Sequence, residues 1–218
     1  MLDNKKVQIL SVNYQDKVKG LFKKYNLNVL ILDKDKKGRR PDFFVYHKNN
    51  REKGFICECK YIASAGVIDN GKYHVSTLDI NLAKRNKGDF ALDDPFAKLE
   101  EVIRNAYSQY RDLIQDKKEC KFFPFVITLE MDFFANNFDF IPRDIYRLNT
   151  ISAVMTIKRN IEQREEFEKW TRKELKEMIN GQSRKKIPPE SVRFKVLLNS
   201  CAEIKFKAED FLRNPIIV

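Results

Sequence analysis

Apolar residues recur along the first part of the chain with two different periods. Between Ser11 and Tyr25 they return every three or four residues, which predicts a helix with Ser11 as its N-cap. Short apolar runs of strand length follow at 27–32, 43–46 and 55–62. Because residues 48–54 have the composition of a turn, the pattern predicts a β-hairpin over 42–62.

The rest of the chain continues with alternating helix and strand patterns. Helical stripes predict a helix over 95–115 and a charged helix over 160–180, and a further short helix is expected near the end of the chain. Strands are predicted at 122–131, 151–157 and 192–198, with 203–206 as an optional further strand. Residues 63–94 show no sustained period and are interpreted as an elaborated loop or an extra hairpin. This order of elements indicates a mixed α/β fold.

The composition of the chain indicates a globular protein and argues against several other classes of protein. Of the 218 residues, 43% are apolar and 33% are charged, which predicts a sizeable core and excludes wholesale disorder. The first residues lack a secretory signal pattern, and we expect no membrane insertion because no uncharged apolar run is long enough. The four cysteines, Cys57, Cys59, Cys120 and Cys201, lack zinc-site spacing, so we expect a reduced, cytoplasmic protein. No phosphate-binding GxxxxGK[ST] motif occurs, so no nucleotide cofactor is expected.

Positive charge is concentrated near the start of the chain. The formal net charge is +11, and residues 1–60, with 15 Lys and Arg and 7 Asp and Glu, hold +8 of it. The densest group is Lys36, Lys37, Arg39 and Arg40, which we interpret as a nucleic-acid-binding loop. The alternative is ordinary solvated surface charge.

Three charged residues of the predicted hairpin carry the candidate chemistry. Asp42 stands at the start of one predicted strand, and Glu58 and Lys60 lie in the next. Side chains alternate along a strand, so Glu58 and Lys60 share one face, while the two cysteines beside Glu58 face the other side as core residues. If the hairpin turns near Arg51, Asp42 lies across from them. Two carboxylates and one lysine then converge on a single face.

Such a group suits phosphodiester hydrolysis. Mg²⁺ prefers oxygen ligands and commonly keeps several waters. Asp42 and Glu58, with the backbone carbonyl of Cys59, are predicted to hold Mg²⁺, for which Mn²⁺ is expected to substitute. The metal would polarise the phosphate, and Lys60 would orient the attacking water and stabilise the developing charge. The alternative is that Glu58 and Lys60 form an ordinary structural ion pair.

The segments Pro41-Asp42 and Glu58-Cys59-Lys60 resemble the PD-(D/E)xK nuclease superfamily, which includes type II restriction endonuclease-like proteins. The resemblance implies a restriction-endonuclease-like αβββαβ core over about residues 11–131, with a mixed central sheet flanked by helices. It implies Asp42 and Glu58 as metal ligands and Lys60 as the catalytic lysine. As accessory residues it suggests an acid on the first helix, with Asp16 favoured over Gln15, and Gln109 on the later helix.

These observations lead to one expected organisation and function. Residues 1–158 are expected to form the nuclease-like core, with 63–94 as an insertion. Residues 159–218 are expected to form a C-terminal extension for dimerisation or substrate recognition. The expected function is a metal-dependent DNA endonuclease, acting as a homodimer. Two alternatives stay open: a non-catalytic nucleic-acid-binding module on the same fold, and a nuclease toxin directed at RNA or tRNA.

Overall fold

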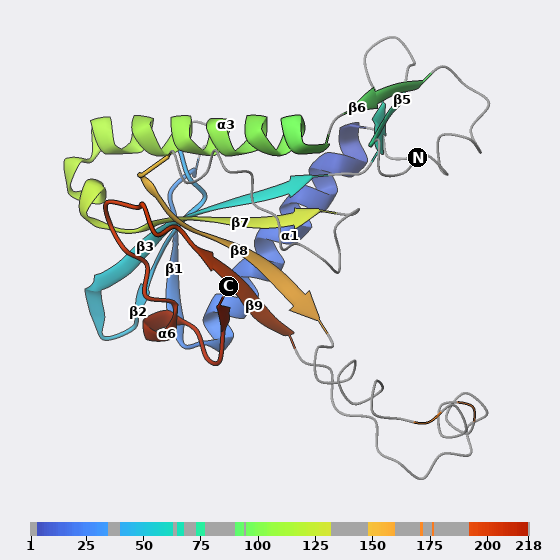
Figure 1. Cartoon of the computed structure of the whole chain (residues 1–218). Helices are drawn as coiled ribbons and strands as arrows, with labels where there is room; N and C mark the ends of the chain where they lie inside the picture. Colours follow the sequence, from blue (N-terminus) through green and yellow to red (C-terminus); the bar gives the residue numbers. More distant parts are fainter. Residues whose placement is uncertain are drawn as a thin grey trace.

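A computed structural model gives the fold of the chain (Figure 1) and describes residues 4–34, 40–62, 65–67, 73–76, 90–93, 95–131, 148–159, 171, 176 and 192–217. The elements of its N-terminal half are α1 (Asn4–Lys24), β1 (Leu27–Ile31), β2 (Phe43–His47), β3 (Asn50–Ile62), β4 (Ala65–Val67), β5 (Tyr73–Ser76) and β6 (Phe90–Asp93). Then follow α3 (Pro95–Asp116), the 3₁₀ helix η2 (Lys118–Phe122), β7 (Phe125–Met131), β8 (Ile151–Arg159), β9 (Val192–Leu198), α6 (Ala208–Phe211) and β10 (Ile216–Ile217). The protein is therefore an α/β protein.

The central layer is a mixed seven-stranded sheet in the order β1-β2-β3-β7-β8-β9-β10. The pairs β1–β2, β2–β3 and β8–β9 are antiparallel, while β3–β7, β7–β8 and β9–β10 are parallel. A second, three-stranded sheet has the order β4-β5-β6. It falls within residues 63–94, so that segment contains more structure than the loop or single hairpin expected.

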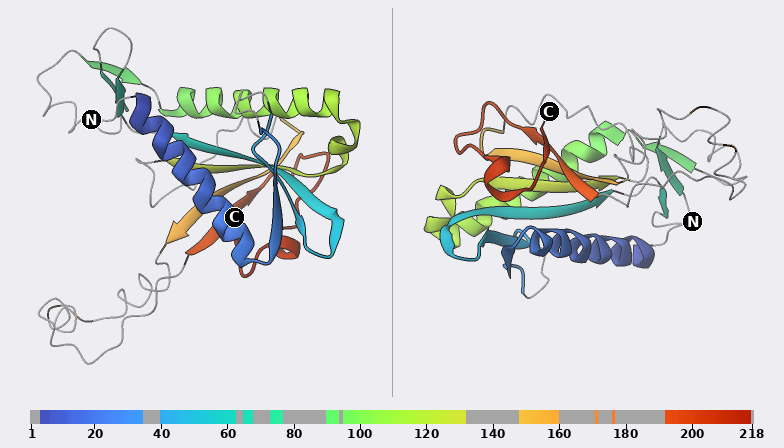
Figure 2. Two further views of the ribbon diagram at one scale, coloured as in Figure 1. Left: turned by 180° about the vertical axis from the view of Figure 1, so that it is seen from behind. Right: turned by 90° about the horizontal axis from the view of Figure 1, so that it is seen from below.

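The two long helices cover opposite faces of the large sheet (Figure 2). On one face, Val18 and Phe22 of α1 are fully buried. On the other face, Leu99 and Leu113 of α3 are fully buried. The helical stripe that predicts 95–115 is confirmed, because its residues Leu99, Ile103, Ala106, Tyr110 and Leu113 are buried in the core between α3 and the sheet. Within the described residues, neither helix is apolar enough over its length to cross a membrane.

The β2–β3 hairpin is confirmed, and Gly54 fixes its close packing. Gly54 pairs with Tyr46, next to an irregularity in register between Tyr46 and His47. A Cβ atom at position 54 would lie 2.8 Å from the Phe44 ring and 2.8 Å from the Val45 carbonyl oxygen. Only glycine leaves room for this approach of the strands.

The N-cap expected at Ser11 is wrong, because α1 already begins at Asn4 and Ser11 lies inside it. The optional strand at 203–206 is also wrong, since these residues form no strand and lead into α6. The strand predicted to begin at 122 begins at Phe125, after the 3₁₀ helix η2. Most of the helix predicted at 160–180 lies outside the described residues.

The end of the chain completes the main core. The strand predicted at 192–198 is confirmed as β9, which pairs with β8, and β10 adds a short parallel edge that the sequence pattern did not indicate. The buried ring of Phe194 stacks on Phe22 of α1 at 5.3 Å between centroids, and Phe206 meets Phe55 of β3 at 5.1 Å. Residues 192–217 therefore belong to the same sheet and core as the N-terminal elements.

Phe194→Ala is expected to lower the free energy of unfolding by about 3–5 kcal/mol, because a fully buried ring is lost from the contact between β9 and α1. Urea unfolding followed by circular dichroism measures the change. Phe122→Ala is the matched control, since the same ring is 69% exposed there, and its effect should stay within about 0.5 kcal/mol. Equal effects of the two substitutions would contradict the packing described for β9.

Candidate active site

The hairpin brings Asp42 and Glu58 into direct contact. Phe43 pairs with Cys57, so Asp42, one residue before β2, lies opposite Glu58 of β3. The backbone N–H of Asp42 donates to Glu58 Oε2 at 3.0 Å. The N–H of Cys59 donates in return to Asp42 Oδ2 at 2.7 Å. These two bonds hold both carboxylates at the same end of the hairpin.

Alternation along β3 separates charged from apolar side chains as predicted. Cys57 and Cys59 are buried in the core beneath α1. Glu58 and Lys60 lie on the opposite face, where Lys60 Nζ forms an ion pair with Glu58 Oε1. Burial raises the pKa of the Cys59 thiol well above its usual value, so this cysteine lacks the thiolate that a nucleophile needs.

A glutamine from each helix contacts this group. Gln15 of α1 donates from Nε2 to Asp42 Oδ1 at 2.8 Å, and Lys60 donates from Nζ to Gln109 Oε1 of α3 at 3.0 Å. Gln109 lies on the helix after β3 and contacts Lys60, and its accessory role stays a prediction. The preference for Asp16 over Gln15 is not reflected in the geometry, since the Asp16 side chain is exposed and Gln15 makes the contact.

The electrostatics of the pair are dominated by burial. Glu58 is only 2% exposed, and its pKa is raised to about 8. Burial is the largest cause and the negative charge of Asp42 the second, while the positive charge of Lys60 lowers the pKa in part. Burial likewise raises the pKa of Asp42 to about 6, although the Cys59 N–H and Lys60 favour its charged form. Glu58 is buried and Asp42 is half-buried, so the two carboxylates are costly to ionise side by side and would be stabilised by a bound cation.

The donor set fits a hard divalent ion with few protein ligands. No group of three or more His, Cys, Asp and Glu side chains that could hold a metal occurs within the described ranges. Mg²⁺ is commonly held by only one or two carboxylates, with waters and phosphate oxygens completing its shell. Three of the four carboxylate oxygens of Asp42 and Glu58 each accept one hydrogen bond, and the fourth pairs with Lys60. Each oxygen has a second lone pair that could bind a metal ion. The pair can therefore supply two ligands to such an ion.

Of the predicted nucleic-acid-binding loop, only Arg40 can be placed. Its guanidinium pairs with Asp116 at the end of α3, with 2.6 Å between Nη2 and Oδ2. Lys36, Lys37 and Arg39 lie outside the described residues. Arg40 is two residues from Asp42, so this end of the loop lies beside the candidate site.

Thr128 contacts the candidate site, although no sequence pattern indicated this contact. The hydroxyl of Thr128 on β7 donates to the backbone carbonyl of Glu58 at 3.3 Å and so supports β3 from the adjacent strand. Thr128 is one of several residues in an apolar, β-rich run, and only the parallel pairing of β3 with β7 brings it to Glu58.

Comparison of the chain with protein-family models, with curated proteins and with solved structures found no match. The interpretation of the site therefore depends on its geometry and chemistry.

In metal-free buffer the free energy of unfolding is expected to fall as pH rises from about 4.5 to about 8. The pKa values of Asp42 and Glu58 are raised to about 6 and about 8, so the folded state binds more protons than the unfolded chain in this window. The expected slope is on the order of 1 kcal/mol per pH unit. Urea unfolding at a series of pH values measures it.

The Asp42→Asn/Glu58→Gln double variant is the control for this pH series, because both titrating groups are removed. Its stability should lack the slope assigned to the pair. A double variant with the same pH dependence as the unmodified protein would show that the two carboxyls are not perturbed in this way.

Proposed function

We propose that this protein is a metal-dependent endonuclease that hydrolyses phosphodiester bonds in DNA, with a restriction-endonuclease-like core. The observation that carries the proposal is the convergence of Asp42, Glu58 and Lys60 at one end of the β2–β3 hairpin. Their order along the chain and their spacing are those of the PD-(D/E)xK motif. In the proposed cellular setting the protein is cytoplasmic and acts as a homodimer, since cutting both strands of a duplex usually needs two active sites.

The arrangement of elements supports the proposal. The order α1, β1, β2, β3, α3, β7 agrees with an αβββαβ core, with the small sheet β4-β5-β6 inserted before α3. In this arrangement the two carboxylates stand on the antiparallel hairpin, and each flanking helix contributes a glutamine. A simple structural ion pair between Glu58 and Lys60 would not require Asp42 to be fixed against Glu58 and the Cys59 N–H.

Asp42 and Glu58 would hold the metal, which when bound polarises the phosphate and lowers the pKa of its water. Gln15 orients the Asp42 carboxylate through its hydrogen bond to Oδ1. The Cys59 N–H fixes the second oxygen of Asp42, and the Asp42 N–H fixes Glu58. Both carboxylates are therefore preorganised by bonds within this chain.

Lys60 is placed to act on the phosphate and the attacking water. Its ammonium group is held between Glu58 and Gln109, so the position of Nζ is fixed by two elements. The side chain is 22% exposed, which leaves a path to substrate. A positioned ammonium group can donate a hydrogen bond to the attacking water and stabilise negative charge that develops on the phosphate.

Purified protein with Mg²⁺ is expected to nick supercoiled plasmid DNA, and Asp42→Asn, Glu58→Gln and Lys60→Ala should each lower the rate at least about 100-fold. Gln15→Ala should lower it about 10- to 100-fold and raise the Mg²⁺ concentration needed, because Gln15 orients a metal ligand. Agarose gels of time courses measure the rates.

Asp16→Asn is the matched control, since Asp16 is the exposed neighbour of Gln15 and should leave the rate unchanged. DNA binding without cleavage across Mg²⁺ and Mn²⁺ would contradict the proposal and favour a non-catalytic binding module. Cleavage of RNA or tRNA but not of DNA would instead identify an RNA-directed nuclease.

A further inference from the structure

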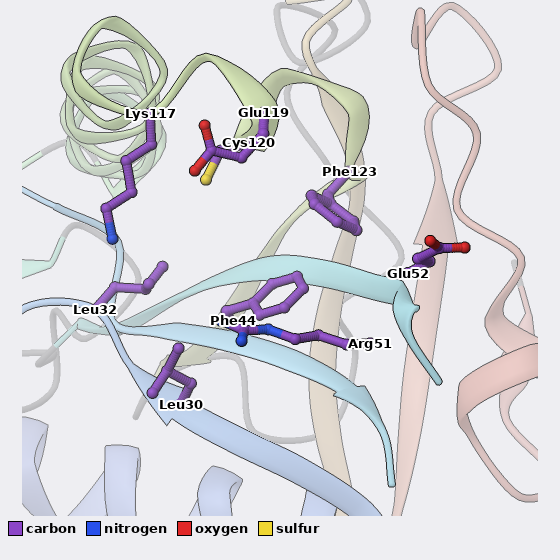
Figure 3. A pocket seen from close by; sticks show the side chains of 9 residues that line it. All are labelled: Leu30, Leu32, Phe44, Arg51, Glu52, Lys117, Glu119, Cys120 and Phe123. Carbon is purple, nitrogen blue, oxygen red and sulfur yellow. The ribbon is translucent and has the colours of Figure 1, made fainter. Parts of the chain in front are cut away.

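Among the depressions that the described residues form, three differ in the charges that line them. The largest of the three, about 380 Å³, lies between the sheet and the segment after α3 (Figure 3). Its floor includes Phe44 and Phe123, and its charged residues are two cations and two carboxylates: Arg51, Lys117, Glu52 and Glu119. Because these charges balance, this cavity does not select an anion.

In the other two depressions, lysines are the only charged residues among the described residues of the lining. One, of about 290 Å³, includes His47, Lys48 and Lys53, and the other, of about 340 Å³, includes Lys23 and Lys48. They share Lys48, and none of the described residues that line either of them is Asp or Glu. We call the surface formed by Lys23, His47, Lys48 and Lys53 the basic corner.

The lysines of the basic corner are available to a ligand. In the part of the chain that the structure describes, Lys23, Lys48 and Lys53 form no ion pair with a carboxylate, and all three are exposed. Glu52 lines the largest of the three depressions and neither of the other two, and it forms no ion pair with Lys53 among the described residues.

An amide adds hydrogen-bond donors to this positive surface. Asn50 Oδ1 accepts from the backbone N–H groups of Glu52 at 2.9 Å and Lys53 at 3.3 Å. Its amide nitrogen is thereby left as the outward donor beside Lys48 and Lys53. Concave surfaces with lysine cations and amide donors, and without carboxylates, suit phosphate groups.

Two elements run from the candidate active site to the basic corner. β2 leads from Asp42 to His47, about 17 Å at the rise of a strand. α1 leads from Gln15 to Lys23, about 12 Å at the rise of a helix. Successive phosphates of one DNA strand advance about 3.4 Å along the helix axis. The two distances, about 12 Å and about 17 Å, therefore correspond to about four and about five base pairs.

We propose that the basic corner binds backbone phosphates of the DNA about four to five base pairs from the bond that is cut. This inference rests on the proposed function, and it adds a contact away from the carboxylates. Contacts of this kind position the DNA without reading its sequence.

The test compares Lys48→Gln/Lys53→Gln with Lys118→Gln/Lys121→Gln, which removes the same charge from η2. Fluorescence anisotropy without divalent metal measures the Kd for a labelled duplex of about 20 base pairs, at about 50 mM and about 200 mM salt. The corner variant should raise Kd at least about tenfold at the lower salt, and its ratio to the unmodified Kd should shrink about tenfold at the higher salt.

The outcomes separate this inference from the proposed function. Equal Kd values for the corner and control variants would overturn the corner site, even where plasmid nicking still depends on Asp42. Weaker binding by the corner variant alone would support the corner site, even where no metal promotes nicking. Loss of binding to vesicles that contain anionic phospholipid, with the DNA Kd unchanged, would assign the corner to membranes and overturn the inference.

Discussion

The geometry of the candidate site depends on the contact between Asp42 and Glu58 across the β2–β3 hairpin. The contact exists because the hairpin register places position 42 opposite position 58, and that register requires the close approach that Gly54 permits. The reciprocal hydrogen bonds from the Asp42 and Cys59 N–H groups then fix both carboxylates. A shift of one residue would turn Glu58 toward the apolar core beneath α1 and separate the pair.

This contact is unfavourable by itself when both groups are charged. Burial raises the pKa of both carboxyls, and Lys60 offsets only part of that cost. Elsewhere the two faces of the sheet are filled by apolar side chains from α1 and α3, which provide the stability that a strained electrostatic site requires. A bound divalent cation would remove the repulsion, while the cationic basic corner lies at the other end of β2. An acidic centre and a separate basic surface are complementary requirements of a protein that binds and cuts a polyanion.

The sequence predicts the hairpin and the group Asp42, Glu58 and Lys60 because both depend on local spacing and on the alternation of side chains in one strand. It also predicts α3, whose apolar stripe is long and regular. It favours Asp16 over Gln15, whereas the structure brings Gln15 to Asp42. Adjacent helical positions differ by about 100°, and only the packing of α1 on the sheet decides which side chain faces Asp42. The contact of Thr128 with Glu58 could not be predicted, because it depends on the pairing of β7 with β3, which is distant along the chain. β10 could not be predicted, because a strand of two residues is too short to show a pattern.

A crystal structure of the protein soaked with Mn²⁺ would show whether Asp42 and Glu58 hold a metal ion, because anomalous scattering locates the metal independently of activity. One strong anomalous peak is expected within coordinating distance of carboxylate oxygens of both Asp42 and Glu58, with Lys60 still beside them. A peak bound elsewhere on the chain, or Asp42 and Glu58 too far apart to share one ion, would contradict this expectation.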